Sequence, residues 1–560
     1  MINYLKKSEN RIFVIVFLVT MFVATSPLMT KLCINGHDLE YHLLRIEALK
    51  EGILMGKPFL KVNVLFFGGA GYASSMFYPD FLLYFPALLR VIGVSINTSY
   101  HIFVATCIIL TYFTTYYSVS SIAKNRYAGI ISAVILTLCN YHIDDVFVRG
   151  AVGEYTAFIF APLVIYGIYN TVYEEMNKPY VLGTGFMGLL LCHTLSFAIL
   201  FVVTALVFII NIKTILKNRV TILRLLATAI ISAGITCSYW LPMLEQMLST
   251  KFYVTTEAWI NPAQEAMQVA DCFNTVFPAL GFAVILFVLP LMFLKKAEND
   301  TAISFSKFLI IIGIVFTYMV TDLFPWERLG KFLSAVQFPW RFFLVVSVLF
   351  SMAAGVILTR VCESVKLNKF IIFTNNNSEN VTSSVMGCLV LYIVIAVMTI
   401  TAFDGMKKNS QGYYDYSNDY YSYKPFTSSV IAGEWLPSTV EDPELIVDMS
   451  DLAVSNNGDI IDIVRYKNSM FVTVDKACEY IDVPFIFYKG YAAELSDRTS
   501  LSVDGSGNNG FARVYTNGNT GKITVSYKGT FAQHLSKGIS FAFIVLLIFA
   551  FMLERRRKNS

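Results

Sequence analysis

Long apolar segments separated by short polar loops dominate the first four hundred residues of the chain. A helix needs about 20 apolar residues to cross a bilayer, and by this criterion the pattern predicts about twelve membrane-spanning helices. The chain is therefore expected to be a multi-pass membrane protein with an all-α membrane region. The predicted spans are residues 12–30, 97–122, 127–140, 154–173, 179–193, 195–212, 220–240, 273–294, 303–322, 341–360, 385–403 and 537–553.

A second pattern occupies residues 404–536, where short alternating stretches are separated by turns rich in glycine and asparagine. Alternation with period two, bounded by such turns, predicts strands of an all-β sandwich. The chain thus divides into a membrane core at 1–403, a β-domain at 404–536, and a last helix with a basic tail at 537–560. The predicted strands are 460–465, 470–474, 483–488, 501–503, 511–515 and 523–527.

The basic residues indicate the orientation of the chain in the membrane. Lysine and arginine in short loops favour the cytoplasmic side, and the predicted spans place nearly all such clusters on one side. Both termini are then cytoplasmic, whereas the first loop, 31–96, and the β-domain lie outside. The clusters are 6–11, 124–126, 178, 213–219, 295–296, 360–369 and 555–558.

Two segments leave alternatives open. Residues 12–30 form either a signal peptide or an uncleaved first helix, and their length favours the helix. Residues 77–94 are apolar enough to span, but they contain two prolines, an aspartate and an arginine. A span there would reverse the membrane orientation of all later helices and place the basic loop 124–126 outside. A helix lying at the outer surface is therefore expected.

Composition narrows the class of protein. Hydrophobic residues make up 56% of the chain and charged residues 15%, with a net charge of +4. The nine cysteines form no CxxC pair, which gives no indication of a disulfide framework or a zinc site. No nucleotide-binding or metalloprotease motif stands in a supporting context, and the scattered basic residues give no reason to expect a nucleic-acid partner.

The first outer loop opens with a concentrated polar cluster at residues 36–45. Asp38, His42 and Arg45 share one face of a predicted helix, and Glu40 flanks them. A carboxylate beside an imidazole and a guanidinium can take a proton and hold a phosphate. In the alternative interpretation Asp38 caps the helix, His42 is solvated and Arg45 reaches toward the interface. The apolar residues of this helix, at 39, 43, 46, 49 and 53, are expected to lie on the membrane.

A second polar cluster falls in the predicted loop at residues 140–154. Asp144, Asp145 and Glu154 offer carboxylates for a divalent cation, Mg or Mn, and Arg149 offers a guanidinium for a phosphate. Charges near a membrane are costly and are often functional. The alternative is a hydrated turn in which Glu154 complements a helix dipole.

Three further features are weaker candidates. Arg341 opens a predicted span and faces either lipid headgroups or a substrate phosphate. His193 is a polar position within an apolar hairpin. The tyrosine-rich run 413–423 suits contact with sugar rings, although a plain edge strand or a linker has the same composition.

A first outer loop with Asp38, Glu40 and His42 resembles that of the GT-C superfamily of membrane glycosyltransferases. More closely, the stretches 36–46, 77–89 (with Tyr78) and 148–154 resemble the YfhO-like bacterial membrane proteins, which also carry an outer β-domain before a last helix. The resemblance implies a bacterial plasma membrane, a polyprenyl-phosphate sugar donor and an acidic residue essential to transfer.

These considerations predict an inverting glycosyltransferase that transfers a sugar to a cell-wall polymer, a lipid or a protein at the outer face. Asp38 is expected to be the general base, positioned by Glu40 and His42. The expected substrate or phosphate contacts are Arg45, Arg149, Arg341, His193 and Tyr78, and the expected metal or acceptor ligands are Asp144, Asp145 and Glu154. The alternatives are a flippase of lipid-linked sugars and a non-catalytic scaffold for envelope assembly.

Overall fold

The computed structural model describes residues 2–256, 260–293, 300–330, 332–364, 378–416 and 433–559. Within the predictions above, the basic residues 295–296 and 366–369 and the tyrosines at 420–423 lie outside this described part. The chain forms two compact units. We call Met1–Leu39, Tyr100–Ser232 and Ile260–Asp415 the helical unit, and Glu40–Ser99, Ala233–Trp259 and Tyr416–Ser560 the mixed unit.

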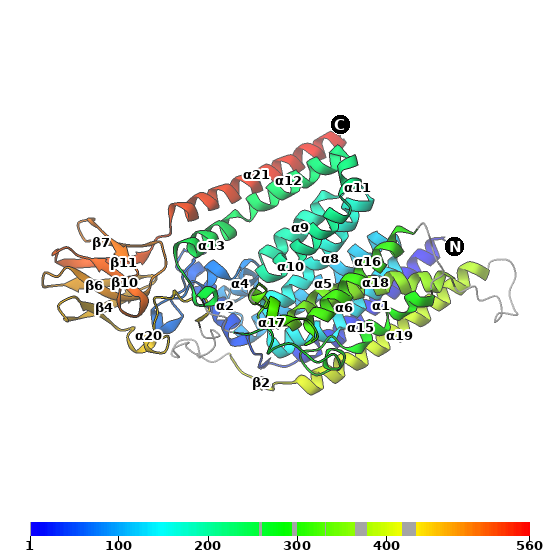
Figure 1. Cartoon of the computed structure of the whole chain (residues 1–560), viewed down its shortest axis with the longest axis horizontal. Helices are drawn as coiled ribbons and strands as arrows, with labels where there is room; N and C mark the ends of the chain where they lie inside the picture. The colour runs from blue at the N-terminus through cyan, green and yellow to red at the C-terminus, as the bar shows by residue number, and fades with distance from the viewer. Residues whose placement is uncertain are drawn as a thin grey trace. The chain divides into compact units, whose positions relative to one another are not determined.

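The helical unit is built from long apolar helices (Figure 1). Helix α8 packs against α9, and α18 packs against both α6 and α16. The last residues of the unit return to its beginning, because the short strand β2 pairs with β1. The bounds are α1 Ile2–Thr25, β1 Cys33–Ile34, α5 Ile96–Ala123, α6 Arg126–Leu138, α7 Asn140–Asp144, η4 Asp145–Arg149, α8 Val152–Tyr173, α9 Pro179–Leu190, α10 Thr194–Ile210, α11 Ile212–Lys217, α12 Arg219–Ile235, α15 Phe282–Leu286, α16 Thr301–Val320, α17 Trp326–Leu329, α18 Phe343–Ser364, α19 Ser378–Asn409 and β2 Tyr413–Tyr414.

Within the described residues, 7 helices are long and apolar enough to cross a membrane, or up to 9 if each of two bent pairs is one span. The chain is therefore a multi-pass membrane protein, with fewer spans than the twelve predicted. The predicted spans at 179–193 and 195–212 form helices of 12 and 17 residues. The span predicted at 273–294 is broken into short pieces, because Pro278 and Pro290 interrupt it.

The predicted loop at 140–154 is helical and buried instead. Helix α6 ends at Leu138. The next residue, Cys139, has an extended backbone, and the chain bends by 47° there before α7 begins. The π-helical turn η4 follows and ends at Gly150, which adopts a left-handed conformation (φ 64°). Such wide turns frequently occur at functional sites. Five successive residues of this turn, Asp145–Arg149, are buried.

In the mixed unit, the first-loop helix forms as predicted, from Leu39 to Leu54. Its residues Leu43, Ile46 and Leu49 are at most 3% exposed, so they pack within the protein rather than lie on the membrane. No helix of spanning length forms at 77–94, as predicted, because the longest helix there has eight residues. The helices of this unit are α2 Leu39–Leu54, α3 Ser74–Phe77, α4 Tyr84–Val91, α13 Cys237–Ser249, α14 Tyr253–Thr256, α20 Leu445–Asp448 and α21 Phe531–Asn559.

Nine antiparallel strands form one sheet in the order β8-β7-β11-β5-β4-β3-β6-β10-β9. The first and last strands of this order are separated in the chain only by Ser502, so the sheet curls into a nearly closed barrel. The prediction of an all-β domain is confirmed, but the domain is a nearly closed barrel and not a sandwich. Alternation of apolar and polar residues does not distinguish a sandwich from a barrel. The strands are β3 Leu452–Ser455, β4 Ile460–Tyr466, β5 Ser469–Val474, β6 Tyr480–Ile486, β7 Tyr491–Leu495, β8 Ser500–Leu501, β9 Val503–Asp504, β10 Phe511–Tyr515 and β11 Gly521–Tyr527.

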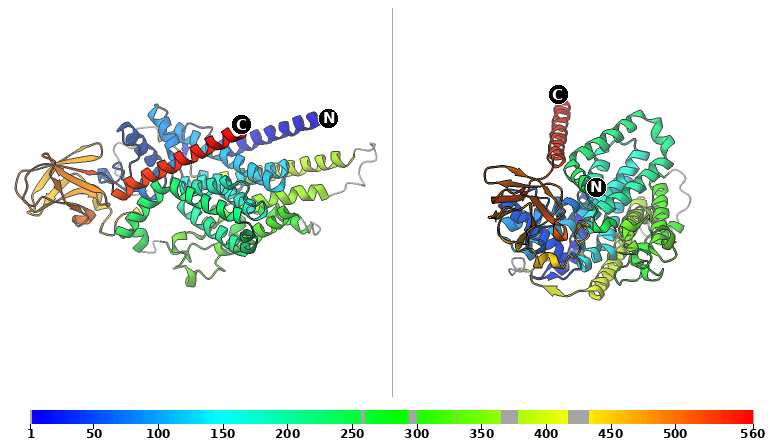
Figure 2. Two further views of the ribbon diagram at one scale, coloured as in Figure 1. Left: turned by 90° about the horizontal axis from the view of Figure 1, so that it is seen from above. Right: turned by 60° about the vertical axis from the view of Figure 1, so that its left-hand side comes forward.

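Helix α21 leaves the barrel after β11 and runs beside α13 (Figures 1 and 2). The backbone N–H of Ser238 donates to the hydroxyl of Ser540 over 2.9 Å, which joins the two helices. Gly234 comes so close to the ring of Phe543 that a Cβ there would lie 2.4 Å from it. The last helix is thus fixed to its own unit by close contact.

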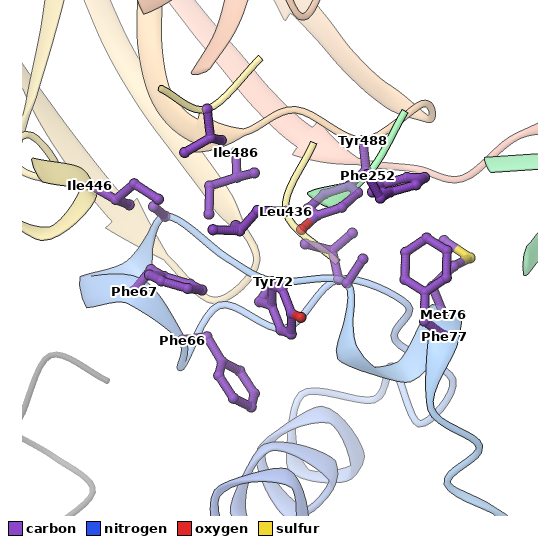
Figure 3. Close-up of a cluster of buried hydrophobic side chains, with 14 of the residues drawn as sticks. Phe66, Phe67, Tyr72, Met76, Phe77, Phe252, Leu436, Ile446, Ile486 and Tyr488 are labelled. Atoms are coloured by element: carbon purple, nitrogen blue, oxygen red, sulfur yellow. The ribbon is translucent and has the colours of Figure 1, made fainter. Parts of the chain in front are cut away.

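A cluster of buried aromatic and aliphatic side chains joins three distant segments of the mixed unit (Figure 3). Phe66, Tyr72 and Phe77 come from the first loop, Phe252 from the region after α13, and Tyr488 from the barrel. The rings of Phe77 and Trp435 stack at 4.1 Å. Burial of this apolar surface is the main force that holds the first loop against the barrel.

Candidate functional site

A buried network of charges centres on Arg149 in the helical unit. Its guanidinium donates to Asp145 over 3.0 Å and to Glu154 over 2.5 Å. Its other terminal nitrogen lies 3.4 Å from the carboxylate of Asp38. The guanidinium also lies over the ring of Trp340, with its central carbon 4.7 Å from the ring centre. A single cation therefore holds three carboxylates from two polar clusters of the sequence.

Glu154 extends the network toward α18. One of its oxygens accepts from the hydroxyl of Tyr141 over 3.0 Å as well as from Arg149, and the other lies 3.1 Å from Nε of Arg341. Arg341 also donates to the side chain of Gln337 over 2.7 Å. Glu154 thus bridges two guanidiniums, a strong arrangement when it is shielded from water.

The main chain brings Asp38 to Arg149. The backbone N–H groups of His37 and Asp38 donate to the carbonyls of Val148 and Arg149, over 3.2 and 2.7 Å. The contact is close because Gly36 has no side chain, and a Cβ there would lie 3.0 Å from the backbone of Arg149. The sequence therefore places Asp38 by backbone pairing, with glycine permitting the approach.

The members of the network differ in their access to solvent. The side chain of Asp145 is fully buried and that of Glu154 is 3% exposed, whereas Asp38 is 19% and Arg341 is 15% exposed. Asp38 is therefore the carboxylate that an external group reaches, and Arg341 is the more accessible cation. A reachable carboxylate in a network with two guanidiniums can take a proton from one substrate while a cation faces an anionic group of another.

His193 lies close to this network, at the turn before α10. Its Nδ1 lies 2.8 Å from the hydroxyl of Ser196. The pKa of His193 is lowered to about 4, mainly by burial; the charge of Glu154 opposes this shift, and the charges of Arg341 and Arg149 contribute to it. His193 is therefore neutral at physiological pH and serves as a hydrogen-bonding group rather than a cation.

The three carboxylates expected to hold a metal do not converge. Asp144 accepts from the side chain of Asn409 over 3.0 Å, whereas the neighbouring Asp145 and Glu154 both contact Arg149. Among the described residues, no group of three histidine, cysteine or acidic side chains is arranged to hold a metal ion. The residues present do not fit a divalent cation, because Asp145 and Glu154 each already pair with the guanidinium of Arg149.

A second charged cluster lies in the mixed unit and centres on Arg45. Its guanidinium donates to Asp80 over 2.6 Å and to the carbonyls of Tyr78 and Pro79 over 3.2 and 2.9 Å. It also lies 3.1 Å from Nδ1 of His42, which must accept because a guanidinium only donates. With 3% of its side chain exposed, Arg45 fastens α2 to the segment at 78–80.

The remaining predicted residues of this unit surround the same cluster. The hydroxyl of Tyr78 donates to Glu434, and its ring lies 5.6 Å from the guanidinium carbon of Arg45. Glu40 stands in the first turn of α2, where its charge suits the positive end of the helix. Asp38 belongs to the helical unit, whereas Glu40, His42 and Arg45 belong to the mixed unit.

The structure thus joins Asp38, Arg149, Arg341 and Glu154, and separately joins His42, Arg45 and Tyr78. Sequence reasoning missed four partners in these sites. Two of them carried a signal, because Tyr141 belongs to the second polar cluster and Trp340 immediately precedes Arg341. Asp80 stood in the stretch 77–89 that carries the family resemblance, although its pairing with Arg45 was not expected. Glu434 carried no signal, since nothing in its local sequence reveals a partner far along the chain.

Comparison with known proteins gives few relatives. No protein-family model matches the chain. A curated protein of Lactococcus lactis subsp. cremoris (strain MG1363), described only as uncharacterized, is 25% identical over 348 residues. The match covers 57% of this chain and 55% of that protein, so the chain spans about half the length of its curated relative.

Solved structures similar to the chain include an oligosaccharyltransferase and an arabinofuranosyltransferase. The archaeal oligosaccharyltransferase AglB from Archaeoglobus fulgidus, in complex with an inhibitory peptide and a dolichol-phosphate, is 12% identical with a TM-score of 0.41, and covers 74% of this chain and 57% of its own. The arabinofuranosyltransferase AftD from Mycobacteria is 14% identical with a TM-score of 0.41, and covers 71% of this chain and 27% of its own. A resemblance at this level does not extend to individual residues.

Proposed function

We propose that the protein is a membrane glycosyltransferase that moves a sugar from a polyprenyl-phosphate donor to a hydroxyl of a cell-envelope acceptor, at the outer face of a bacterial plasma membrane. The observation that carries the proposal is the position of Asp38. It is the accessible carboxylate of a buried network that also presents two guanidiniums. Glycosyl transfer from a lipid phosphate needs both a base and cationic groups for the leaving phosphate.

In the proposed reaction, Asp38 accepts the proton of the acceptor hydroxyl as its oxygen attacks the anomeric carbon. The bond from that carbon to the phosphate oxygen breaks, and the lipid phosphate leaves with the electron pair. Displacement from the opposite face inverts the anomeric centre. Arg341 receives the developing negative charge, and Arg149 keeps Asp38 in position.

The other residues of the network have supporting roles in this proposal. Glu154 bridges the guanidiniums of Arg149 and Arg341 and fixes their positions. Tyr141 orients Glu154 through its hydroxyl. His193, neutral beside the same network, is available to hydrogen-bond the phosphate or a sugar hydroxyl. Arg45, His42 and Tyr78 stabilise the first loop. The reaction as proposed uses no divalent cation.

The test is a transfer assay with full-length protein in nanodiscs, radiolabelled undecaprenyl-phosphate hexoses and a crude wall-polymer fraction. Wild type is expected to transfer label, and Asp38→Asn is expected to lose at least a hundredfold in rate, since base catalysis contributes roughly 10²–10⁴. The matched control is Asp404→Asn, which removes an exposed carboxylate of the same unit that pairs with Lys408.

The result of this assay distinguishes a glycosyltransferase from a flippase or a scaffold. Loss in Asp38→Asn with an unchanged melting temperature supports the proposal. Equal transfer by wild type and Asp38→Asn would assign the base elsewhere. If no donor supports transfer, the glycosyltransferase proposal is overturned, and a flippase or a scaffold is favoured. A flippase would be revealed in the same nanodiscs by movement of labelled lipid between leaflets.

A further inference from the structure

A cavity of about 50 Å³ lies in the helical unit, and Asp144 is among the residues that line it. Roughly 10–15 Å³ of such space holds one water molecule, so the cavity admits a small group such as a hydroxymethyl. Its walls are largely apolar, with Phe147 and Ile34 among them. Ser410 and Tyr413, both with exposed side chains, also line the cavity, so it borders the protein surface.

The carboxylate of Asp144 is only half satisfied. Its side chain is fully buried, and one oxygen accepts from Asn409 over 3.0 Å. The other oxygen is buried and has no hydrogen-bond partner. Asn409 cannot supply a second bond, because its amide also donates to the carbonyl of Thr275 and its oxygen accepts from the backbone of Phe277.

A buried carboxylate oxygen without a donor is costly. It is typical of a site that a ligand completes, and the chemistry of the cavity limits what that ligand is. A divalent cation needs several oxygen ligands, whereas Asp144 is the one carboxylate among the described residues that line this cavity. An ammonium group needs three acceptors, but a hydroxyl needs only one and leaves its carbon atoms against apolar walls.

We propose that this cavity binds a hydroxyl group of a saccharide, with Asp144 as the acceptor of its hydrogen bond and Phe147 against its carbon face. The inference rests on the proposed function and names a subsite for its carbohydrate. The cavity shares its wall with the backbone that positions Asp38, because Val148 lines it and accepts from the N–H of His37. A saccharide anchored here is thus held by the same backbone pairing that holds the proposed base.

The test measures binding without transfer. Saturation-transfer difference NMR on full-length protein in nanodiscs would use the methyl glycosides of glucose, galactose and mannose at millimolar concentration, with methylammonium as a charged competitor. At least one glycoside is expected to bind saturably to wild type, and its affinity is expected to fall at least tenfold in Asp144→Asn. Met406→Phe, which fills the cavity from α19, is expected to abolish the same signal.

Stability distinguishes a binding role from a structural one. Asp144→Asn replaces a buried carboxyl group, one oxygen of which has no hydrogen-bond partner, so its melting temperature is expected to equal or exceed that of wild type. A fall of several degrees would assign Asp144 a structural role and overturn the proposal, as would equal glycoside binding by both proteins, saturable binding by none, or displacement by methylammonium. The transfer assay is independent, because wild type can move label whether or not this cavity binds the glycoside.

Discussion

Arg149 and Asp38, 111 residues apart in the chain, meet with a guanidinium nitrogen 3.4 Å from a carboxylate oxygen. This is the longest of the three contacts that Arg149 makes to carboxylates. The other two partners are buried more deeply. The arrangement gives Asp38 a fixed position without a short ion pair that an incoming substrate would have to break.

The first prediction concerns the stability of this network. Arg149→Met leaves Asp145 and Glu154 as buried carboxylates with fewer partners, and such a loss costs about 3–5 kcal/mol of unfolding free energy. Denaturation of the variant in detergent should show this loss. The triple variant that adds Asp145→Asn and Glu154→Gln should recover most of it, and failure to recover would show that Arg149 stabilises by packing on Trp340 instead.

A second prediction separates Arg341 from Arg149. Arg341→Gln should raise the KM for the polyprenyl-phosphate donor about tenfold or more, because it removes the accessible cation for the phosphate. Its melting temperature should change little, since Glu154 keeps its bond to Arg149. Initial rates over a range of donor concentrations measure the effect, and an unchanged KM would remove Arg341 from the phosphate site.

For Arg45, a loss of stability is expected first. Arg45→Gln breaks the contact with Asp80 and leaves that carboxylate, 7% exposed, without its cation, at a cost of about 3–5 kcal/mol. Thermal unfolding measures the change. The double variant with Asp80→Asn should be more stable than Arg45→Gln alone. If Arg45→Gln instead keeps its stability and loses donor affinity, Arg45 binds the phosphate after all.

The fourth prediction is a pH dependence from Lys61. Burial lowers its pKa from 10.5 to about 8, with Asp80 opposing and Lys537 adding to the shift. Between pH 8 and pH 10.5 the unfolded chain therefore binds more protons here than the folded protein, so this group makes stability rise with pH across that window. Lys61→Met should flatten the rise in melting temperature, whereas Lys57→Met, at an exposed position, should leave it intact.

Much of the helical architecture is predictable because hydropathy is a local property. The helix after Asp38 and the long helices at 96–123 and 343–364 follow from residue patterns alone. The break between helices α6 and α7 at Cys139 could not be predicted from the pattern, because the residues on both sides are mostly apolar. Strand β7 escaped prediction for a similar reason, since Tyr-Ala-Ala-Glu-Leu contains residues that favour helices.

The sequence indicated which residues form the charged network around Arg149, but not which of them contact one another. Asp38, Arg149 and Glu154 stand out in the sequence because charges are rare in this chain. Their convergence depends on a backbone pairing across more than a hundred residues, which no local pattern encodes. The expected metal site illustrates the limit, because adjacent residues such as Asp144 and Asp145 face different partners.

The pairing of β1 with β2 joins Cys33 to Tyr414 and Ile34 to Tyr413. The ribosome must therefore translate nearly the whole helical unit before the segment leading to Asp38 acquires its partner strand. At about 5–20 residues per second this delay lasts tens of seconds. During biogenesis the nascent protein thus carries Cys33 and Ile34 without their partner strand, whereas the backbone partners of His37 and Asp38, at Val148 and Arg149, are made much earlier.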